Sequence, residues 1–227
     1  MPDRETRELL VELLRDFYRK DWVSGTGGGI CGPSDDGNLL VAPTGVHKER
    51  VRPDDLFIID VADTSIRRPA ADPALRPSEC GHIFTLVARE RGVRSIVHTH
   101  ALSAVLAGDL SGDADHVVVQ QLEMLKGIRG LTNQDRHLLP VIDNTPREAQ
   151  LVTNVERMLT DPRFDAAFGV LVRDHGCYVW GTDVWEAKRH TEVYHYLFGA
   201  VVARAERGFR PPVVQSDPSP EKEEERP

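Results

Sequence analysis

The 227-residue sequence has no long apolar run. No stretch approaches the roughly 18 consecutive apolar residues that a membrane-spanning helix needs. The first residues, Met1-Pro2-Asp3-Arg4-Glu5, lead directly into an amphipathic segment without the apolar core of a signal peptide. The sequence therefore predicts a cytoplasmic protein with no membrane partner.

Cysteine is scarce, with only Cys31, Cys80 and Cys177. The three are widely separated and form no CxxC pair, which excludes a disulfide framework and a four-cysteine zinc site. Each is predicted to be a reduced thiol that packs as a small apolar side chain.

Positive charge is also in deficit. The 28 Lys and Arg against 36 Asp and Glu give a net charge of −8, which argues against nucleic acid or an anionic membrane as the main partner. An anionic substrate would have to be bound by local groups. The apolar fraction of 40% is that of a folded globular protein.

The chain divides into one domain and a tail. Residues 211–227 contain five prolines and the run Glu221-Lys222-Glu223-Glu224-Glu225, a composition that cannot bury enough apolar surface to fold. We predict a disordered acidic tail there and a single folded domain over residues 1–210.

Helical and strand patterns alternate along that domain, which predicts an α/β layered fold. Helices are expected at about 4–20, 78–91, 101–110, 148–159 and 183–207, and strands at 30–31, 39–41, 56–61, 94–100, 117–119, 168–172 and 177–180. The connection at residues 174–176 is too short for a parallel crossover, so part of the sheet must be antiparallel.

Two histidines, His98 and His100, are two residues apart in a predicted strand, so both rings project from one face, about 7 Å apart at Cα. They could chelate a metal or be solvated at a strand end. His175, at a predicted hairpin tip, is the best third ligand, and three imidazoles leave the fourth position of a catalytic zinc open. His190 and His195, at i and i+5, are interpreted as surface or packing residues.

The run Gly25-Thr26-Gly27-Gly28-Gly29 matches neither the dinucleotide fingerprint nor the P-loop. Its backbone N–H groups, with the Thr26 hydroxyl, could bind a phosphate, and Thr44-Gly45 near Lys48 could complete that anion site. A flexible hairpin loop is the alternative.

Two carboxylates are candidate acid–base groups. Glu79 opens the helix before the His98 strand, where a first-turn acid is also favoured by the helix dipole. Glu123 lies among apolar residues, but a salt bridge with Lys126 or Arg129 would equally explain it.

Taken together, several motifs resemble the methylthioribulose-1-phosphate dehydratase family of the class II aldolase/adducin superfamily, over about residues 9–197. Besides the glycine run, they are Ala42-Pro43-Thr44-Gly45-Val46-His47-Lys48-Glu49-Arg50, His98-Thr99-His100, Glu123-Met124-Leu125-Lys126-Gly127-Ile128, Asn144-Thr145-Pro146 and Arg173-Asp174-His175-Gly176-Cys177-Tyr178-Val179-Trp180-Gly181.

The resemblance implies a three-layer α/β/α class II aldolase-like fold with a central, largely antiparallel sheet, assembled as a homotetramer with active sites near subunit interfaces. It makes His98, His100 and His175 the ligands of one Zn²⁺ per subunit and Glu123 the acid–base, with Glu79 in the position that the aldolases use. Substrate contacts are implied for Cys80 and, at the phosphate, for Thr26, Gly27, Gly28, Thr44 and Gly45.

The implied reaction is the dehydration of 5-methylthioribulose 1-phosphate to 2,3-diketo-5-methylthiopentyl 1-phosphate in methionine salvage. A class II aldolase or epimerase acting on another ketose phosphate is the enzymatic alternative. A metal-free interaction module, as in adducin, is the non-enzymatic one.

Overall fold

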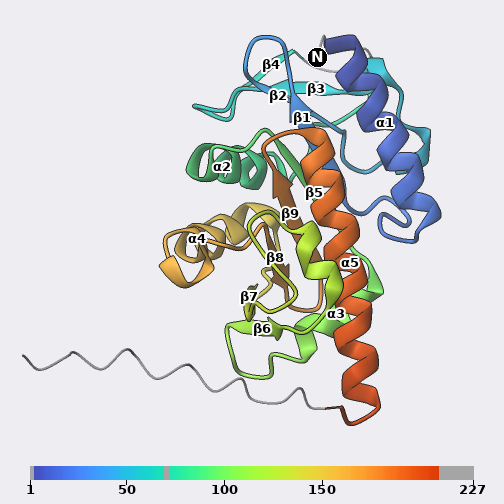
Figure 1. Cartoon of the computed structure of the whole chain (residues 1–227). Coiled ribbons are helices and arrows are strands. Elements are labelled where there is room, and N and C mark those ends of the chain that lie inside the picture. The colour runs from blue at the N-terminus through green and yellow to red at the C-terminus, as the bar shows by residue number, and fades with distance from the viewer. Residues whose placement is uncertain (1–2, 69–71, 210–227) are drawn as a thin grey trace, which may run out of the picture.

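A computed structural model describes residues 3–68 and 72–209 of the chain, which form one nine-stranded sheet between two layers of helices (Figure 1). The helices are α1 (Asp3–Arg19), α2 (Gly81–Arg91), α3 (Leu102–Asp109), α4 (Glu148–Leu159) and α5 (Val184–Glu206). The strands are β1 (Gly29–Pro33), β2 (Leu39–Val41), β3 (Phe57–Ile59), β4 (Ile66–Arg68), β5 (Ser95–Thr99), β6 (His116–Val119), β7 (His137–Ile142), β8 (Gly169–Val172) and β9 (Gly176–Gly181). Four 3₁₀ turns complete it: η1 (Lys48–Arg50), η2 (Pro53–Asp55), η3 (Glu123–Gly127) and η4 (Pro162–Phe164).

The predicted tail at 211–227 lies outside the described residues, so its disorder stays a prediction. Within 3–68 and 72–209, no helix combines the length and the apolar character needed to cross a membrane.

The sheet has the order β4-β3-β2-β1-β5-β9-β8-β7-β6. Every neighbouring pair is antiparallel except β7 and β8, which confirms the expected largely antiparallel sheet. β5 and β9 lie at its centre, and their register places Thr99 opposite Cys177. This pairing brings the β8–β9 turn to the end of β5.

The helices α1, α3 and α5 cover one face of the sheet, and α2 and α4 cover the other (Figure 1). Alternation along β5 divides its side chains between the two cores. Ile96 packs with the α2 and α4 residues, whereas Val97 packs with α1 and the start of α5. The three-layer α/β/α arrangement is therefore confirmed.

Several boundaries differ from the sequence prediction: β3 is Phe57–Ile59 where a strand over 56–61 is predicted, and β5 is Ser95–Thr99 where 94–100 is predicted. α2 begins at Gly81 rather than near Ser78, because Ser78 Oγ accepts a hydrogen bond from the Cys80 backbone N–H (3.2 Å) and so forms a turn before the helix. The sequence did not predict the strands β4 and β7, and β7 contains Pro140, a residue that is unfavourable inside a sheet.

Candidate metal centre and active site

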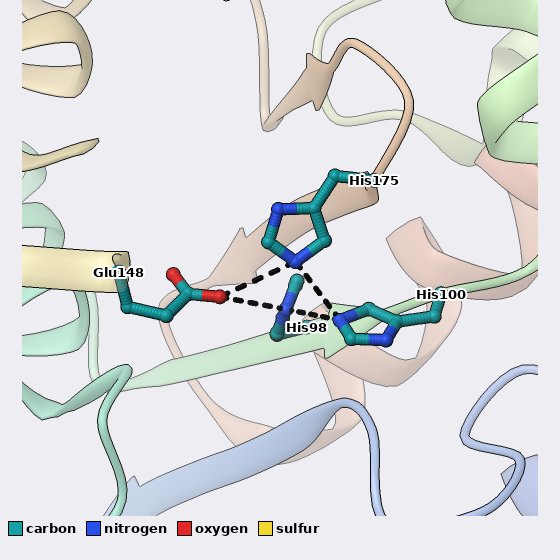
Figure 2. A group of neighbouring side chains, drawn as sticks. All are labelled: His98, His100, Glu148 and His175. Carbon is teal, nitrogen blue, oxygen red and sulfur yellow. Dashed lines mark hydrogen bonds and ion pairs between the residues drawn. The ribbon is translucent and has the colours of Figure 1, made fainter. Parts of the chain in front are cut away.

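The three histidines singled out in the sequence converge at one point (Figure 2). His98 and His100 project from the same face at the end of β5, and His175 reaches them from the β8–β9 turn. The Nε2 atom of His100 lies 2.8 Å from that of His98 and 3.0 Å from that of His175. Segments 75 residues apart thus form one cluster.

Hydrogen bonds fix the tautomers of two of these rings. His98 Nδ1 lies 3.0 Å from the Cys177 carbonyl oxygen, which can only accept, so this nitrogen carries the hydrogen. His175 Nδ1 donates to Asn144 Oδ1 (3.1 Å), an oxygen that also accepts from the Thr145 backbone N–H (2.8 Å). Both rings therefore present Nε2 lone pairs to the centre of the cluster, as metal ligands do.

A fourth group, Glu148, completes the cluster (Figure 2). Its Oε1 lies 3.2 Å from His175 Nε2 and 3.6 Å from His98 Nε2. The Tyr178 hydroxyl donates to the other carboxylate oxygen at 2.5 Å. Burial alone would raise the pKa of Glu148, but the interactions of its carboxylate with the His175 and His98 rings and with the Tyr178 hydroxyl outweigh it and hold the pKa below its usual range.

The sequence analysis did not single out Glu148. It is the first residue of α4 and follows the Asn144-Thr145-Pro146 motif by two positions. Its closeness to that motif could have indicated Glu148 as a site residue from the sequence. Only the fold shows that the start of α4 faces the end of β5.

These four groups fit a metal ion. Zinc bonds of about 2.0–2.1 Å in a tetrahedron place neighbouring donor atoms about 3.3 Å apart. Four of the six spacings run from 2.8 to 3.6 Å, on both sides of that value, and all four donor atoms lie within 4.8 Å of one another. Burial, helped by the neighbouring His98 and His175, lowers the pKa of His100 to about 3, so its ring is neutral near pH 7 and available as a ligand.

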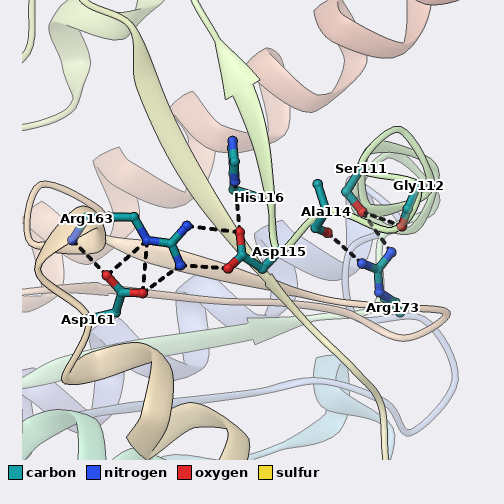
Figure 3. A network of polar contacts seen from close by, with 8 residues as sticks. All are labelled: Ser111, Gly112, Ala114, Asp115, His116, Asp161, Arg163 and Arg173. Atoms are coloured by element: carbon teal, nitrogen blue, oxygen red, sulfur yellow. Dashed lines mark hydrogen bonds and ion pairs between the residues drawn. The ribbon is translucent and has the colours of Figure 1, made fainter.

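Arg173 anchors the turn that carries His175 to neighbouring segments of the chain (Figure 3). Its guanidinium donates to Ser111 Oγ and to the Ala114 carbonyl, both at 2.7 Å, and to Asp143 at 3.0 Å. In the same region Arg163 binds both Asp115 and Asp161 at 2.6 Å (Figure 3). The bonds made by Arg173 hold the third histidine on a supported turn.

An opening of about 380 Å³ leads from the surface to the cluster. Its lining includes His100, His175 and Glu148, together with Glu79 and the 144–147 segment. The structure thus brings Glu79, a predicted acid–base candidate, to the same opening as the cluster of three histidines and Glu148.

Glu123 lies elsewhere in the chain. Its side chain, in η3, is 69% exposed. It pairs with Lys126 at 2.7 Å and accepts from Asn133 Nδ2 at 2.8 Å. The salt bridge considered in the sequence is therefore present, and Glu123 is not among the residues that line the opening.

The glycine-rich run lies directly against the cluster. A Cβ at Gly27 would stand 2.4 Å from His100 Nδ1, and the φ of +72° at Gly28 favours glycine. Lys48, 1% exposed, donates to the carbonyls of Thr26 (2.9 Å) and Pro43 (3.2 Å). This ammonium ties the glycine run to the Thr44-Gly45 turn.

Two basic side chains, Lys48 and Arg76, lie beside the Thr44-Gly45 turn. Burial lowers the pKa of Lys48, whose described hydrogen bonds are to carbonyl oxygens. The Arg76 guanidinium lies beside Gly45, with Nη2 2.9 Å from the position of an added Cβ. Cys80 is buried nearby at the start of α2, where burial raises the pKa of its thiol to about 12 and keeps it protonated.

Comparison with known families gives a match over residues 8–202 to the model described as Class II Aldolase and Adducin N-terminal domain. Curated relatives include methylthioribulose-1-phosphate dehydratases from Osmerus mordax (42% identical; 93% of this chain, 88% of the relative) and Homo sapiens (37%; 90% and 86%).

Solved structures share the fold. YgbL from Klebsiella pneumoniae matches with a TM-score of 0.76 at 20% identity, covering 92% of this chain and 94% of that one. An L-fuculose 1-phosphate aldolase matches with a TM-score of 0.73 at 16% identity, covering 94% and 91%.

Proposed function

The chain belongs to the class II aldolase and adducin family, and from that membership we propose that it is a methylthioribulose-1-phosphate dehydratase, a hydro-lyase of methionine salvage. It removes water from 5-methylthioribulose 1-phosphate to give 2,3-diketo-5-methylthiopentyl 1-phosphate. The observation that carries the proposal is the convergence of three histidines and a carboxylate in a chain whose dehydratase relatives match it over most of its length.

We propose zinc as the metal, one ion per subunit, held by His98, His100 and His175. Glu148, whose Oε1 lies 3.2 Å from His175 Nε2, would be a fourth ligand or would hydrogen-bond a group at the open position. When bound, the ion supplies Lewis acidity that stabilises negative charge on substrate oxygens beside the carbon that loses a proton.

The reaction also needs a base for the C3 proton and an acid for the departing C4 hydroxyl. We propose Glu123 as the main acid–base and Glu79 as the second carboxylate. Because Glu123 is exposed and outside the opening of its own subunit, it would act at the opening of a neighbouring subunit. This role requires the homotetramer with interfacial active sites that the family resemblance implies.

The phosphate of the substrate is assigned to the glycine-rich run and the following turn. Backbone N–H groups of Gly28 and Gly45, with the hydroxyls of Thr26 and Thr44, are suitable donors. The Gly27 N–H donates to the Ser24 carbonyl at 3.2 Å, so Gly27 would have to exchange that bond to contact the phosphate. Arg76 supports this assignment by adding a guanidinium beside Gly45. Cys80 is proposed to contact the substrate as a neutral thiol.

Aldol cleavage or epimerisation of another ketose phosphate is the second candidate, favoured by the place of Glu79 at the opening. The two are separated by incubating the purified protein with 5-methylthioribulose 1-phosphate and, in parallel, with fuculose 1-phosphate or ribulose 5-phosphate. We expect diketone from the first and no released aldehyde or epimer from the others. The reverse result would assign the aldolase or epimerase activity.

Metal analysis tests the centre itself. We expect one zinc per subunit in the wild type, and loss of most of the zinc and nearly all activity in His175→Ala, because one of three imidazole donors is removed. A His175→Ala protein with full zinc occupancy would contradict the assigned ligand set.

A further inference from the structure

A buried histidine outside the metal-binding cluster, His195 of α5, lies beneath the strand that carries two of the ligands. Its side chain is 5% exposed, and its Nε2 lies 3.0 Å from Thr99 Oγ1. Thr99 stands between His98 and His100, and strand alternation directs its side chain to the opposite face. His195 therefore contacts β5 from the side away from the cluster.

His195 also holds the segment that binds the backbone of His100. Its ring stacks on that of Trp22, with centroids 4.1 Å apart and an interplanar angle of 22°. The carbonyl oxygen of Trp22 accepts a hydrogen bond from the His100 N–H at 2.8 Å. A single imidazole thus contacts both the residue before His100 and the residue that bonds its backbone.

Thr99 connects this contact to the other two ligands. Its Oγ1 lies 3.2 Å from Cys177 Sγ, and the Cys177 carbonyl accepts the Nδ1–H of His98. At Gly176, next to His175, an added Cβ would stand only 1.9 Å from the Thr99 carbonyl oxygen. Because the backbones are this close, a displacement of Thr99 is transmitted to the turn that carries His175.

We propose that His195 is a positioning residue for the metal centre, which fixes Thr99 and Trp22 and through them the geometry of the three histidines. The inference depends on the proposed metal site but assigns a role to a residue that does not touch the metal. Because the His195 ring is rigid and belongs to α5, its contacts with Thr99 and Trp22 connect this helix to the strand end that carries His98 and His100.

The test compares variants of the full chain by two metal readouts: Zn²⁺ affinity in competition with a chromophoric chelator, and the visible absorption spectrum of the Co²⁺-loaded protein. His195→Phe keeps a stacking ring but removes the bond to Thr99 and the 3.4 Å contact of Nδ1 with Ser103 Oγ. His195→Gln keeps an amide able to bond Thr99. Thr99→Val removes the hydroxyl from the other side of the same contact.

We expect His195→Phe and Thr99→Val to weaken Zn²⁺ binding about tenfold, the lower end of the effect of outer-shell groups, and to alter the Co²⁺ spectrum. His195→Gln should recover most of the affinity and the wild-type spectrum. The matched control is His137→Phe: His137 is 2% exposed and bonds Tyr194 of the same helix at 3.0 Å, away from the cluster. It should lose stability but bind Zn²⁺ as the wild type does.

Wild-type affinity and spectrum in both His195→Phe and Thr99→Val would overturn the inference, as would an equal loss in His137→Phe. A wild-type chain that binds no Zn²⁺ would instead refute the proposed metal centre itself. Thr99→Val keeps the test decisive if His195→Phe does not fold.

Discussion

At the scale of single residues, the geometry of the proposed metal centre depends on how closely the backbone approaches its histidines, and Gly27 is the clearest case. A Cβ there would stand 2.4 Å from His100 Nδ1, well inside van der Waals contact. We expect Gly27→Ala to displace the His100 ring and lower both zinc content and turnover at least tenfold, as disturbance of groups that orient a ligand does.

Gly29→Ala is the control for that substitution, because its Cβ would meet Phe84 at an ordinary 3.6 Å. Zinc content by mass spectrometry and turnover on the same samples give the comparison. Equal zinc loss in both variants would show that the glycine run tolerates no side chain at all and that the contact with His100 is not the cause.

The choice between carboxylates is also a residue-scale question. We expect Glu123→Gln to retain zinc and lose roughly 10²–10⁴ in turnover, the usual contribution of general acid–base catalysis. Glu79→Gln should lose less, because Glu79 would then serve mainly to position substrate in the opening. Steady-state turnover with zinc analysis measures both, and the reverse order would assign the main acid–base role to Glu79.

At the scale of elements, β7 is held to α5 by one buried polar pair. His137 Nε2 lies 3.0 Å from the Tyr194 hydroxyl oxygen, which accepts from the Phe168 backbone N–H at 3.1 Å. Burial lowers the pKa of His137 to about 4, against 6.5 for an exposed ring. Burial therefore favours the neutral imidazole in the folded chain.

This gives a pH dependence with a definite sign. Above pH 6.5 the ring is neutral in both the folded and the unfolded chain, so it makes no pH-dependent contribution. Between pH 6.5 and about 4 the unfolded chain binds a proton that the folded chain does not, so the free energy of unfolding falls as the pH falls.

We expect His137→Gln, which does not titrate, to flatten the plot of unfolding free energy against pH in that window by up to one proton, or about 1.4 kcal/mol per pH unit. Urea denaturation of both proteins at several pH values measures the difference. Parallel plots for the two proteins would show that His137 does not titrate on unfolding.

At the scale of the whole molecule, α3 and the residue after it present an apolar stripe to solvent. Leu102, Leu106 and Leu110 are spaced four residues apart, and Leu102 is 70% exposed. Met124, next to Glu123, is also partly exposed. Exposed apolar residues aligned in this way are typical of an interface between subunits.

We expect the wild type to have the mass of a tetramer by light scattering, and the double variant Leu102→Glu, Leu106→Glu to dissociate. Zinc should be retained while turnover falls, because Glu123 would no longer reach a neighbouring opening. Tyr18→Glu, an exposed apolar position on α1, is the control. A double variant that remains tetrameric would exclude α3 as the interface.

Much of the architecture follows from local periodicity. The leucine spacing in residues 4–20 predicts α1, and its Leu10, Leu14 and Phe17 are fully buried. The period of two in the His98 segment places two imidazoles on one face of β5. These features need only neighbouring residues, so the sequence contains them directly.

The tertiary structure alone decided which distant groups complete the site. Glu148 begins a helix like any first-turn acid, and His195 matched no motif. The register of β5 with β9 and the packing of α4 and α5 on opposite faces bring Glu148 beside His175 and His195 beneath Thr99. Such contacts join segments dozens of residues apart. Local sequence patterns do not predict them, because sheet register and helix packing depend on the whole core.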